Sequence, residues 1–281
     1  MFKTIKKTQY GNTLIQLIEQ NIVDNWNLDA LTDYKGFTLQ THDVARKIEK
    51  LHILFENSGV EKGDKIALCG RNSTHWAVAF LATLTYGAIA VPILHEFTAE
   101  QIHHIVNHSG AKLLFAGDVV ATIIDGDKMP GIEGIIFIPD YSLKLSRTEK
   151  LTYAREHLNE MFGKKYPKYF RKQHVNYYKE QSPDELAVLK YTSGTTGFSK
   201  GVMIPYRAMW SNYDFAESVL GDKLKKGDNV ISILPMAHMY GMAFEFIFEF
   251  LHGCHIFYLT HVPSPALIAQ AFTDVKPKII I

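Results

Sequence analysis

Short apolar runs alternate with amphipathic stretches along most of the 281 residues. The runs at 65–69 and 88–92 have the length of strands. The stretch between them starts after the capping residue Ser73, has helical spacing, and ends at Gly87. Further strand-like runs occur at 112–116, at 135–138 and beyond. Strands that alternate with helices across short connections predict an α/β fold with a mainly parallel sheet and helices on its faces.

The beginning of the chain shows a different order of elements. Between residues 11 and 60 two amphipathic patterns flank a polar turn, which predicts two helices on either side of a hairpin. Residues 77–94 form a run of eighteen without a charge, long enough to suggest a membrane span. Gly87 and Pro92 interrupt this run, so we expect a helix and a buried strand instead.

The last third of the chain repeats the alternation. We expect strands at 229–234 and 254–259, helices at 242–251 and 266–272, and the start of another strand at 278–281. An apolar strand of this kind is buried only when it has neighbours on both sides. We therefore expect the chain to be the N-terminal part of a longer protein.

Segment 141–181 has a composition of its own. It carries ten Lys or Arg residues against four Glu, a net charge of about +6, and eight aromatic residues. A solvated insertion with helical pieces is the first interpretation, and a weak peripheral contact with an anionic membrane is the alternative. The whole chain carries 30 basic and 29 acidic residues, so no global field attracts nucleic acid, and we expect no nucleic-acid partner.

Cysteine and histidine spacing indicates no metal centre. Cys69 and Cys254 lie far apart and form no Cys-x-x-Cys pair, which fits buried thiols in a reducing cytoplasm. His104 and His108 are four residues apart on an expected helix, a spacing that can bind zinc, but no third ligand lies near them in the sequence. We expect ordinary surface or core histidines there and a cytoplasmic protein.

The stretch 191–201 reads Tyr-Thr-Ser-Gly-Thr-Thr-Gly-Phe-Ser-Lys-Gly and combines five Ser or Thr hydroxyl groups, three glycines and a lysine. Glycines let backbone amides approach a polyphosphate, hydroxyls add donors, and the lysine offsets charge. A Walker A loop would end in Gly-Lys-Ser/Thr and open a helix. Here Lys200 is followed by Gly201 and a strand-like run, so the sequence predicts a phosphate-binding loop of another kind.

This loop resembles the Tyr-Thr-Ser-Gly-Thr-Thr-Gly-x-Pro-Lys-Gly signature of the adenylate-forming (AMP-binding) superfamily, which includes acyl-CoA synthetases and luciferases. The stretch from Gly63 to Pro92 is similar to an earlier block of that superfamily. Residues 234–240, Leu-Pro-Met-Ala-His-Met-Tyr, resemble the Leu-Pro-Leu-x-His block of its long-chain fatty-acid branch, and 275–278 resemble the segment before that branch's next strand.

The resemblance implies layered β-sheets with flanking helices and an ATP-dependent activation of a fatty acid, followed by transfer of the acyl group to coenzyme A. Lys200 and His238 would be catalytic, and the hydroxyl of Thr192 would be a ligand of Mg²⁺. The residues that would bind ATP are Thr192, Ser193, Gly194, Thr195, Thr196, Gly197, Lys200 and Gly201. The implied small molecules are ATP, Mg²⁺, coenzyme A and the fatty acid, and a homodimer is one possible assembly.

The chain departs from the family pattern in two ways. Ser199 stands where the family has proline, and the sequence stops before the family's later blocks and its small C-terminal domain. We therefore expect residues 1–281 to be a truncated N-terminal adenylation domain, inactive alone. Residues 63–221 would form a first α/β subdomain, and 11–58 with 222–281 part of a second. Two alternatives stay open: a non-catalytic nucleotide- or acyl-binding module, and adenylation of another carboxylic acid.

Overall fold

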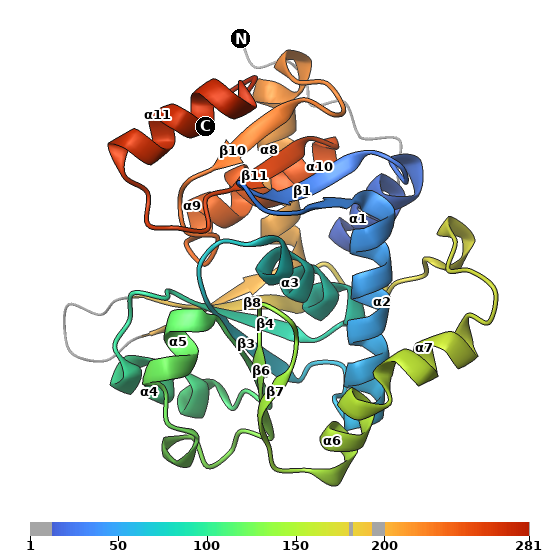
Figure 1. The fold of residues 1–281 in the computed structure, drawn as a ribbon, viewed down its shortest axis with the longest axis vertical. Coiled ribbons are helices and arrows are strands. Elements are labelled where there is room, and N and C mark those ends of the chain that lie inside the picture. The colour runs from blue at the N-terminus through green and yellow to red at the C-terminus, as the bar shows by residue number, and fades with distance from the viewer. Residues whose placement is uncertain (1–12, 180–181, 193–199, 281) are drawn as a thin grey trace.

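The computed structural model describes residues 13–179, 182–192 and 200–280, and Figure 1 shows their arrangement in two stacked sheets with helices between and around them. The strands of the larger sheet are β3 (Lys65–Cys69), β4 (Ile89–Ile93), β5 (Leu113–Ala116), β6 (Gly134–Phe137), β7 (Leu143–Ser146), β8 (Leu186–Tyr191) and β9 (Gly201–Pro205). The strands of the smaller sheet are β1 (Asp29–Asp33), β2 (Thr38–Gln40), β10 (Asn229–Ser232) and β11 (His255–Tyr258).

The larger sheet has the order β7-β6-β5-β3-β4-β8-β9. Its five inner strands are parallel, and β7 and β9 pair antiparallel at the two edges. The smaller sheet has the order β10-β11-β1-β2, with parallel pairs except for β1 and β2. The α/β alternation predicted a mainly parallel sheet, and that prediction is confirmed.

Helices form three layers around the two sheets. They are α1 (Leu14–Asp24), α2 (Thr41–Ser58), α3 (Thr74–Tyr86), α4 (Ala99–Ser109), α5 (Asp118–Ile123), α6 (Glu149–Glu156), α7 (Leu158–Lys165), α8 (Tyr206–Leu220), α9 (Met239–Met242), α10 (Glu249–His252) and α11 (Pro265–Val275), with a π-helical turn η4 (Ala243–Phe248) between α9 and α10 and 3₁₀ turns at Gly126–Lys128, Lys172–His174 and Gly221–Lys223. The middle layer shares one core with both sheets, because Leu68 of β3 and Ile256 of β11 belong to the same buried cluster. Helix α4 covers the other face of the larger sheet, and α11 covers the smaller one.

Local sequence signals explain how the inner helices begin and end. The hydroxyl of Ser73 accepts a hydrogen bond from the amide of Trp76 and caps α3. Gly87 ends the helix with φ of 87°, a left-handed conformation that glycine adopts without strain. The run 77–94 is thus divided between α3 and β4, as its Gly and Pro predicted. Within the part of the chain that the structure describes, no helix is both long and apolar enough to cross a membrane.

Three expectations about elements need correction or completion. Residues 278–280 are not in a strand. Their neighbour at the sheet edge is the start of β10, where the amide of Lys278 donates one hydrogen bond to the carbonyl of Asn229. The helix expected at 242–251 contains a π-helical turn, which 3.6-residue periodicity does not indicate. In the basic segment the helical pieces are confirmed, and the sequence analysis missed the edge strand β7.

Candidate functional site

The phosphate-loop candidates lie at the end of a hairpin on one edge of the larger sheet. Strand β8 pairs in parallel with β4, and β9 returns antiparallel to β8 with Tyr191 opposite Gly201. The amide of Thr192 donates a hydrogen bond of 3.2 Å to the carbonyl of Lys200. Thr192, directly after β8, and Lys200, directly before β9, are therefore held side by side, and both residues are exposed.

The return of the chain into β9 confirms that no helix opens after Lys200. The site therefore lacks the helix N-terminus on which a Walker A loop places its phosphate. Five of the predicted nucleotide-binding residues lie outside the described residues: Ser193, Gly194, Thr195, Thr196 and Gly197.

Gly201 has a packing reason to be glycine. A Cβ atom there would lie 3.2 Å from Leu189 Cδ1 and 3.3 Å from Tyr191 Cζ, both on the facing strand. The Tyr191 ring is buried, and its hydroxyl lies 2.7 Å from Nδ1 of His108 on α4. The glycine thus makes room for a ring that fixes the hairpin against the helix below. His108 has this structural partner, and among the described residues no group of three or more His, Cys, Asp or Glu side chains could hold a metal ion.

Lys190 is a buried cation directly before the loop. Its side chain is 7% exposed, and among the described residues its Nζ has no hydrogen-bond partner. Burial lowers the pKa of Lys190 to about 8, although Cys69 and Glu96 act in the opposite direction. A buried ammonium group without a partner is costly, so the burial of Lys190 lowers stability beside the candidate site. Charge patterning along the sequence did not single out Lys190.

His238 lies in a loop at the carboxyl end of β10. It is exposed and caps α9, where its Nδ1 accepts a hydrogen bond of 3.3 Å from the amide of Tyr240. Among the described residues, no hydrogen bond joins it to Thr192 or Lys200. The structure thus brings two of the predicted catalytic and metal-binding residues together and places His238 on the other sheet.

Two buried polar side chains hold the loop at residues 233–238, here called the His238 loop, in place. Asn72, next to the cap of α3, donates to the carbonyl of Leu234 at 2.7 Å and accepts from the amide of Met236 at 2.8 Å. Glu245, in the π-helical turn, accepts from the amides of Ile233 and Leu234 at 2.7 and 2.8 Å. The loop is therefore tied to both the larger sheet and its own helix.

The environment of Glu245 sets two opposing effects on its pKa. Burial raises the pKa, and the backbone donors of Leu234 and Ile233 lower it, with burial the larger effect. One helical turn later Glu249 is almost fully buried, and burial together with Glu245 holds its pKa well above the usual range. The negative charge is thus best accommodated on Glu245, where three polar contacts favour it: the amides of Ile233 and Leu234 and the side chain of Ser232.

A pocket of about 240 Å³ lies between the carboxyl ends of the two sheets, beside the His238 loop. The lining residues are Arg71, Asn72, His95, Glu96, Ile233, Pro235, Leu259, His261, Val262 and Pro263. Arg71 follows β3 directly, and among the described residues its buried Nε has no partner. In parallel α/β sheets ligands bind outside the carboxyl ends of the strands. That rule, applied to the sequence, would have singled out Arg71 as a candidate for binding an anion.

The comparisons with known proteins agree with this geometry. The family model described as AMP-binding enzyme matches residues 19–281. The chain is 26% identical over 250 residues to the long-chain-fatty-acid–CoA ligase of Escherichia coli, with 80% of the chain and 43% of that protein covered. It is 26% identical over 259 residues to the probable 4-coumarate–CoA ligase 1 of Dictyostelium discoideum, covering 85% of the chain and 45% of that protein.

A solved structure shows the same fold. The red-emitting luciferase of Phrixothrix hirtus superposes with a TM-score of 0.77 at 16% identity, covering 98% of this chain and 51% of that one. The chain therefore spans less than half the length of the curated relatives it matches. With the family model matching nearly all of its residues, the chain belongs to the AMP-binding enzyme family.

Proposed function

We propose that the intact protein activates a carboxylic acid with ATP to form an acyl-adenylate and passes the acyl group to coenzyme A. The carboxylate oxygen attacks the α-phosphorus of ATP, pyrophosphate leaves, and the thiol of coenzyme A then displaces AMP. The observation that carries this proposal is the end of the β8–β9 hairpin. There Thr192 and Lys200, from the family's signature loop, face solvent on adjacent strands.

The chain's own residues would act mainly by placement and charge. Lys200 would lie against the β- and γ-phosphates and offset the charge of the departing pyrophosphate. The hydroxyl of Thr192 would supply one oxygen to Mg²⁺. Because Mg²⁺ binds through few protein oxygens and the substrate's phosphates, a single hydroxyl and an ATP-bound metal fit the described residues. Bound Mg²⁺ would neutralise phosphate charge.

We propose a long-chain fatty acid as the acid substrate. The Leu-Pro-Met-Ala-His block around His238 and the resemblance to the E. coli ligase support this choice. The similar identity to a protein named as a probable 4-coumarate–CoA ligase favours testing an aryl acid as the competing substrate. His238 would lie near the attacking carboxylate, and Arg71 at the neighbouring pocket would favour an anion there.

Lys200→Ala in the intact protein tests the phosphate assignment. A charged hydrogen bond contributes about 1.5 to 3 kcal/mol, so we expect acid-dependent exchange between ATP and pyrophosphate to fall roughly ten- to a hundredfold. Lys225→Ala is the matched control, since Lys225 is an exposed lysine in the turn before β10. Unchanged exchange in Lys200→Ala would show that the loop is not the phosphate site.

The substrate is tested separately on the unmodified intact protein. Exchange that depends on long-chain fatty acids supports the proposal, and exchange driven only by aryl or amino acids would replace it with another adenylation. A protein that binds ATP with no exchange for any acid would instead be the non-catalytic binding module. Pyrophosphate exchange measured with palmitate, 4-coumarate and amino acids side by side separates these outcomes.

A further inference from the structure

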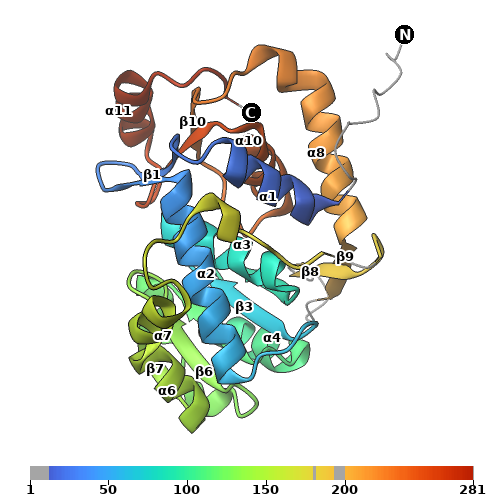
Figure 2. The same ribbon diagram turned by 90° about the vertical axis from the view of Figure 1, so that its right-hand side faces the viewer.

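We call strands β8 and β9, with Thr192 and Lys200 at their end, the phosphate hairpin. A second pocket lies away from this hairpin, between helix α2, the turn after β6, and helices α6 and α7. Figures 1 and 2 show α6 and α7 lying against α2. The pocket has a volume of about 410 Å³, within the usual range of small-molecule sites. Its lining residues are Arg46, Lys47, Lys50, Leu51, Asp140, Tyr141, Arg155, Leu158, Asn159 and Phe162.

The lining is strongly basic. Arg46, Lys47, Lys50 and Arg155 contribute four positive charges and Asp140 one negative charge, which leaves a net charge of +3. The cations come from two separate parts of the sequence that the fold brings together, since three lie on α2 and Arg155 lies on α6. Such a concentration contrasts with the nearly neutral chain.

Three of these cations meet neutral partners. Lys50 Nζ donates to Asn159 Oδ1 at 2.8 Å, Arg155 Nε donates to the carbonyl of Tyr141 at 2.5 Å, and Lys47 Nζ lies 3.1 Å from Nε2 of His75. Among the described residues, no carboxylate lies within ion-pair distance of Lys47, Lys50 or Arg155. Their charge is therefore only partly offset, by Asp140 acting on Arg155 and by Asp43 acting on Lys47 from a longer distance.

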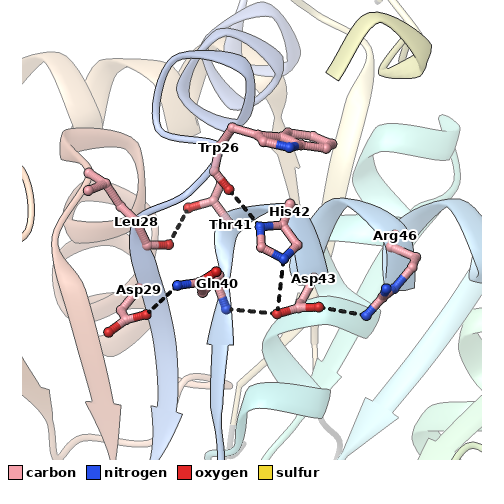
Figure 3. A network of polar contacts seen from close by, with 8 residues as sticks. All are labelled: Trp26, Leu28, Asp29, Gln40, Thr41, His42, Asp43 and Arg46. Atoms are coloured by element: carbon pink, nitrogen blue, oxygen red, sulfur yellow. Dashed lines mark hydrogen bonds and ion pairs between the residues drawn. The ribbon is translucent and has the colours of Figure 1, made fainter. Parts of the chain in front are cut away.

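Arg46 is placed by the start of helix α2. Its NH2 lies 2.6 Å from Oδ1 of Asp43, and Asp43 Oδ2 accepts from the amide of Gln40 at 3.2 Å. Figure 3 shows this network, in which Asp43 joins the cap of the helix to Arg46. Arg46 thus has one counter-ion, Asp43, which is not itself part of the pocket lining.

The charges act on one another. Burial lowers the pKa of Lys50, and Arg46 and Arg155 lower it further. Burial also lowers the pKa of Lys47, and Lys50 and Arg46 add to this effect, while Asp43 acts in the opposite direction. Both lysines would gain from an anion placed between these side chains, because an opposite charge within a few ångströms favours the charged form.

The apolar part of the lining consists of the buried Leu51 and Leu158 together with Phe162. Lys50 Nζ lies 5.3 Å from the ring centre of Phe162. A site that combines several cations with apolar side chains suits a small phosphate ester. We propose that this pocket binds a phosphate monoester, either a free organic phosphate or the headgroup of phosphatidic acid, apart from the ATP site. The proposal uses no residue of the phosphate hairpin.

The test is a titration of the protein with glycerol 3-phosphate, followed by isothermal calorimetry. A companion experiment measures sedimentation with phosphatidylcholine vesicles that contain or lack phosphatidic acid. We expect Lys50→Met to weaken binding about tenfold or more, because it removes one charged donor and keeps the side-chain stem. Lys164→Met, also a lysine near this surface but paired with Glu160, is the matched control and should bind like the unchanged protein.

Two further variants keep the result interpretable. Arg46→Gln changes a half-exposed side chain and should also weaken binding. It replaces Lys50→Met as the test if thermal melting shows that Lys50→Met is poorly folded. Lys200→Ala should bind as well as the unchanged protein, which separates this pocket from the phosphate hairpin.

The two arms identify the source of the phosphate. Binding of glycerol 3-phosphate in solution supports a free ester, and binding only to vesicles with phosphatidic acid supports the lipid. No binding in either arm would overturn the proposal. Equal losses in Lys50→Met and Lys164→Met would also overturn it, since general charge attraction would then explain the binding, and so would loss of binding in Lys200→Ala.

Discussion

The phosphate hairpin and the His238 loop both expose their candidate residues to solvent. They differ in the buried charged residue that lies beneath each of them. Thr192 directly follows β8, Lys200 directly precedes β9, and His238 lies in the loop after β10; all three are exposed. Behind the hairpin lies Lys190, a buried cation whose Nζ has no partner among the described residues. Behind the loop lies Glu245, a buried carboxylate that accepts two backbone hydrogen bonds.

This difference separates two uses of a buried charge. A carboxylate that satisfies otherwise unpaired amides stabilises the loop it holds, and its removal leaves those amides without an acceptor. A lysine without a partner lowers stability, and its removal should raise it. Substitutions at the two positions should therefore change stability in opposite directions.

Glu245→Leu should have the largest effect. The leucine fills a similar volume and leaves the amides of Ile233 and Leu234 without their acceptor, so we expect stability to fall by roughly 3 to 5 kcal/mol for two lost hydrogen bonds to a charged group. Urea unfolding of this chain measures the change. Glu245→Gln keeps one acceptor oxygen and should recover part of the loss. A leucine variant as stable as the unchanged chain would show that the two hydrogen bonds do not hold the loop.

Lys190→Met should raise stability, with a dependence on pH. Lys190 has a pKa of about 8 in the folded chain and about 10.5 when unfolded, so the cost of its burial is absent above pH 10.5. The cost grows as pH falls from about 10.5 to about 8 and stays constant below that. At pH 7 the gain should be on the order of 3 kcal/mol.

Melting temperatures of both proteins between pH 7 and pH 10 check this expectation. The gap between them should narrow as the pH rises. Lys112→Met is the control, because Lys112 forms an ion pair with Asp64 and has a raised pKa. A lower melting temperature for Lys190→Met at pH 7 would mean that the ammonium group has a stabilising partner.

Much of the fold could be predicted because its signals are local. Ser73 and Gly87 mark both ends of α3, and the alternation of runs determines a parallel sheet whatever the side-chain contacts are. The phosphate loop could be found for the same reason, since its hydroxyls, glycines and lysine are contiguous. A strand expected at 278–281 was wrong for 278–280, because apolar composition does not specify a pairing partner.

The supports of the site could not be predicted from spacing. Asn72 and Met236 are 164 positions apart and meet only because β3 and β10 end at the same place between the sheets. Glu245 reads as a solvent-facing residue of a helix, and the π-helical turn carries it into the interior. Likewise Lys50 and Arg155 reach one pocket through the packing of α6 on α2. Each depends on tertiary contacts that no local pattern encodes.

Thr192→Val should have the smallest effect on stability and a clear effect on activity. Thr192 is exposed, and valine keeps its β-branched shape, so unfolding should change by no more than about 0.5 kcal/mol. In the intact protein, loss of the hydroxyl should lower acid-dependent pyrophosphate exchange about tenfold if it binds phosphate or Mg²⁺. Thr192→Ser keeps the hydroxyl and should retain most of the exchange. Equal exchange in the valine and serine variants would show that the Thr192 hydroxyl has no part in the reaction. Lys200 would then remain as the catalytic candidate of the hairpin.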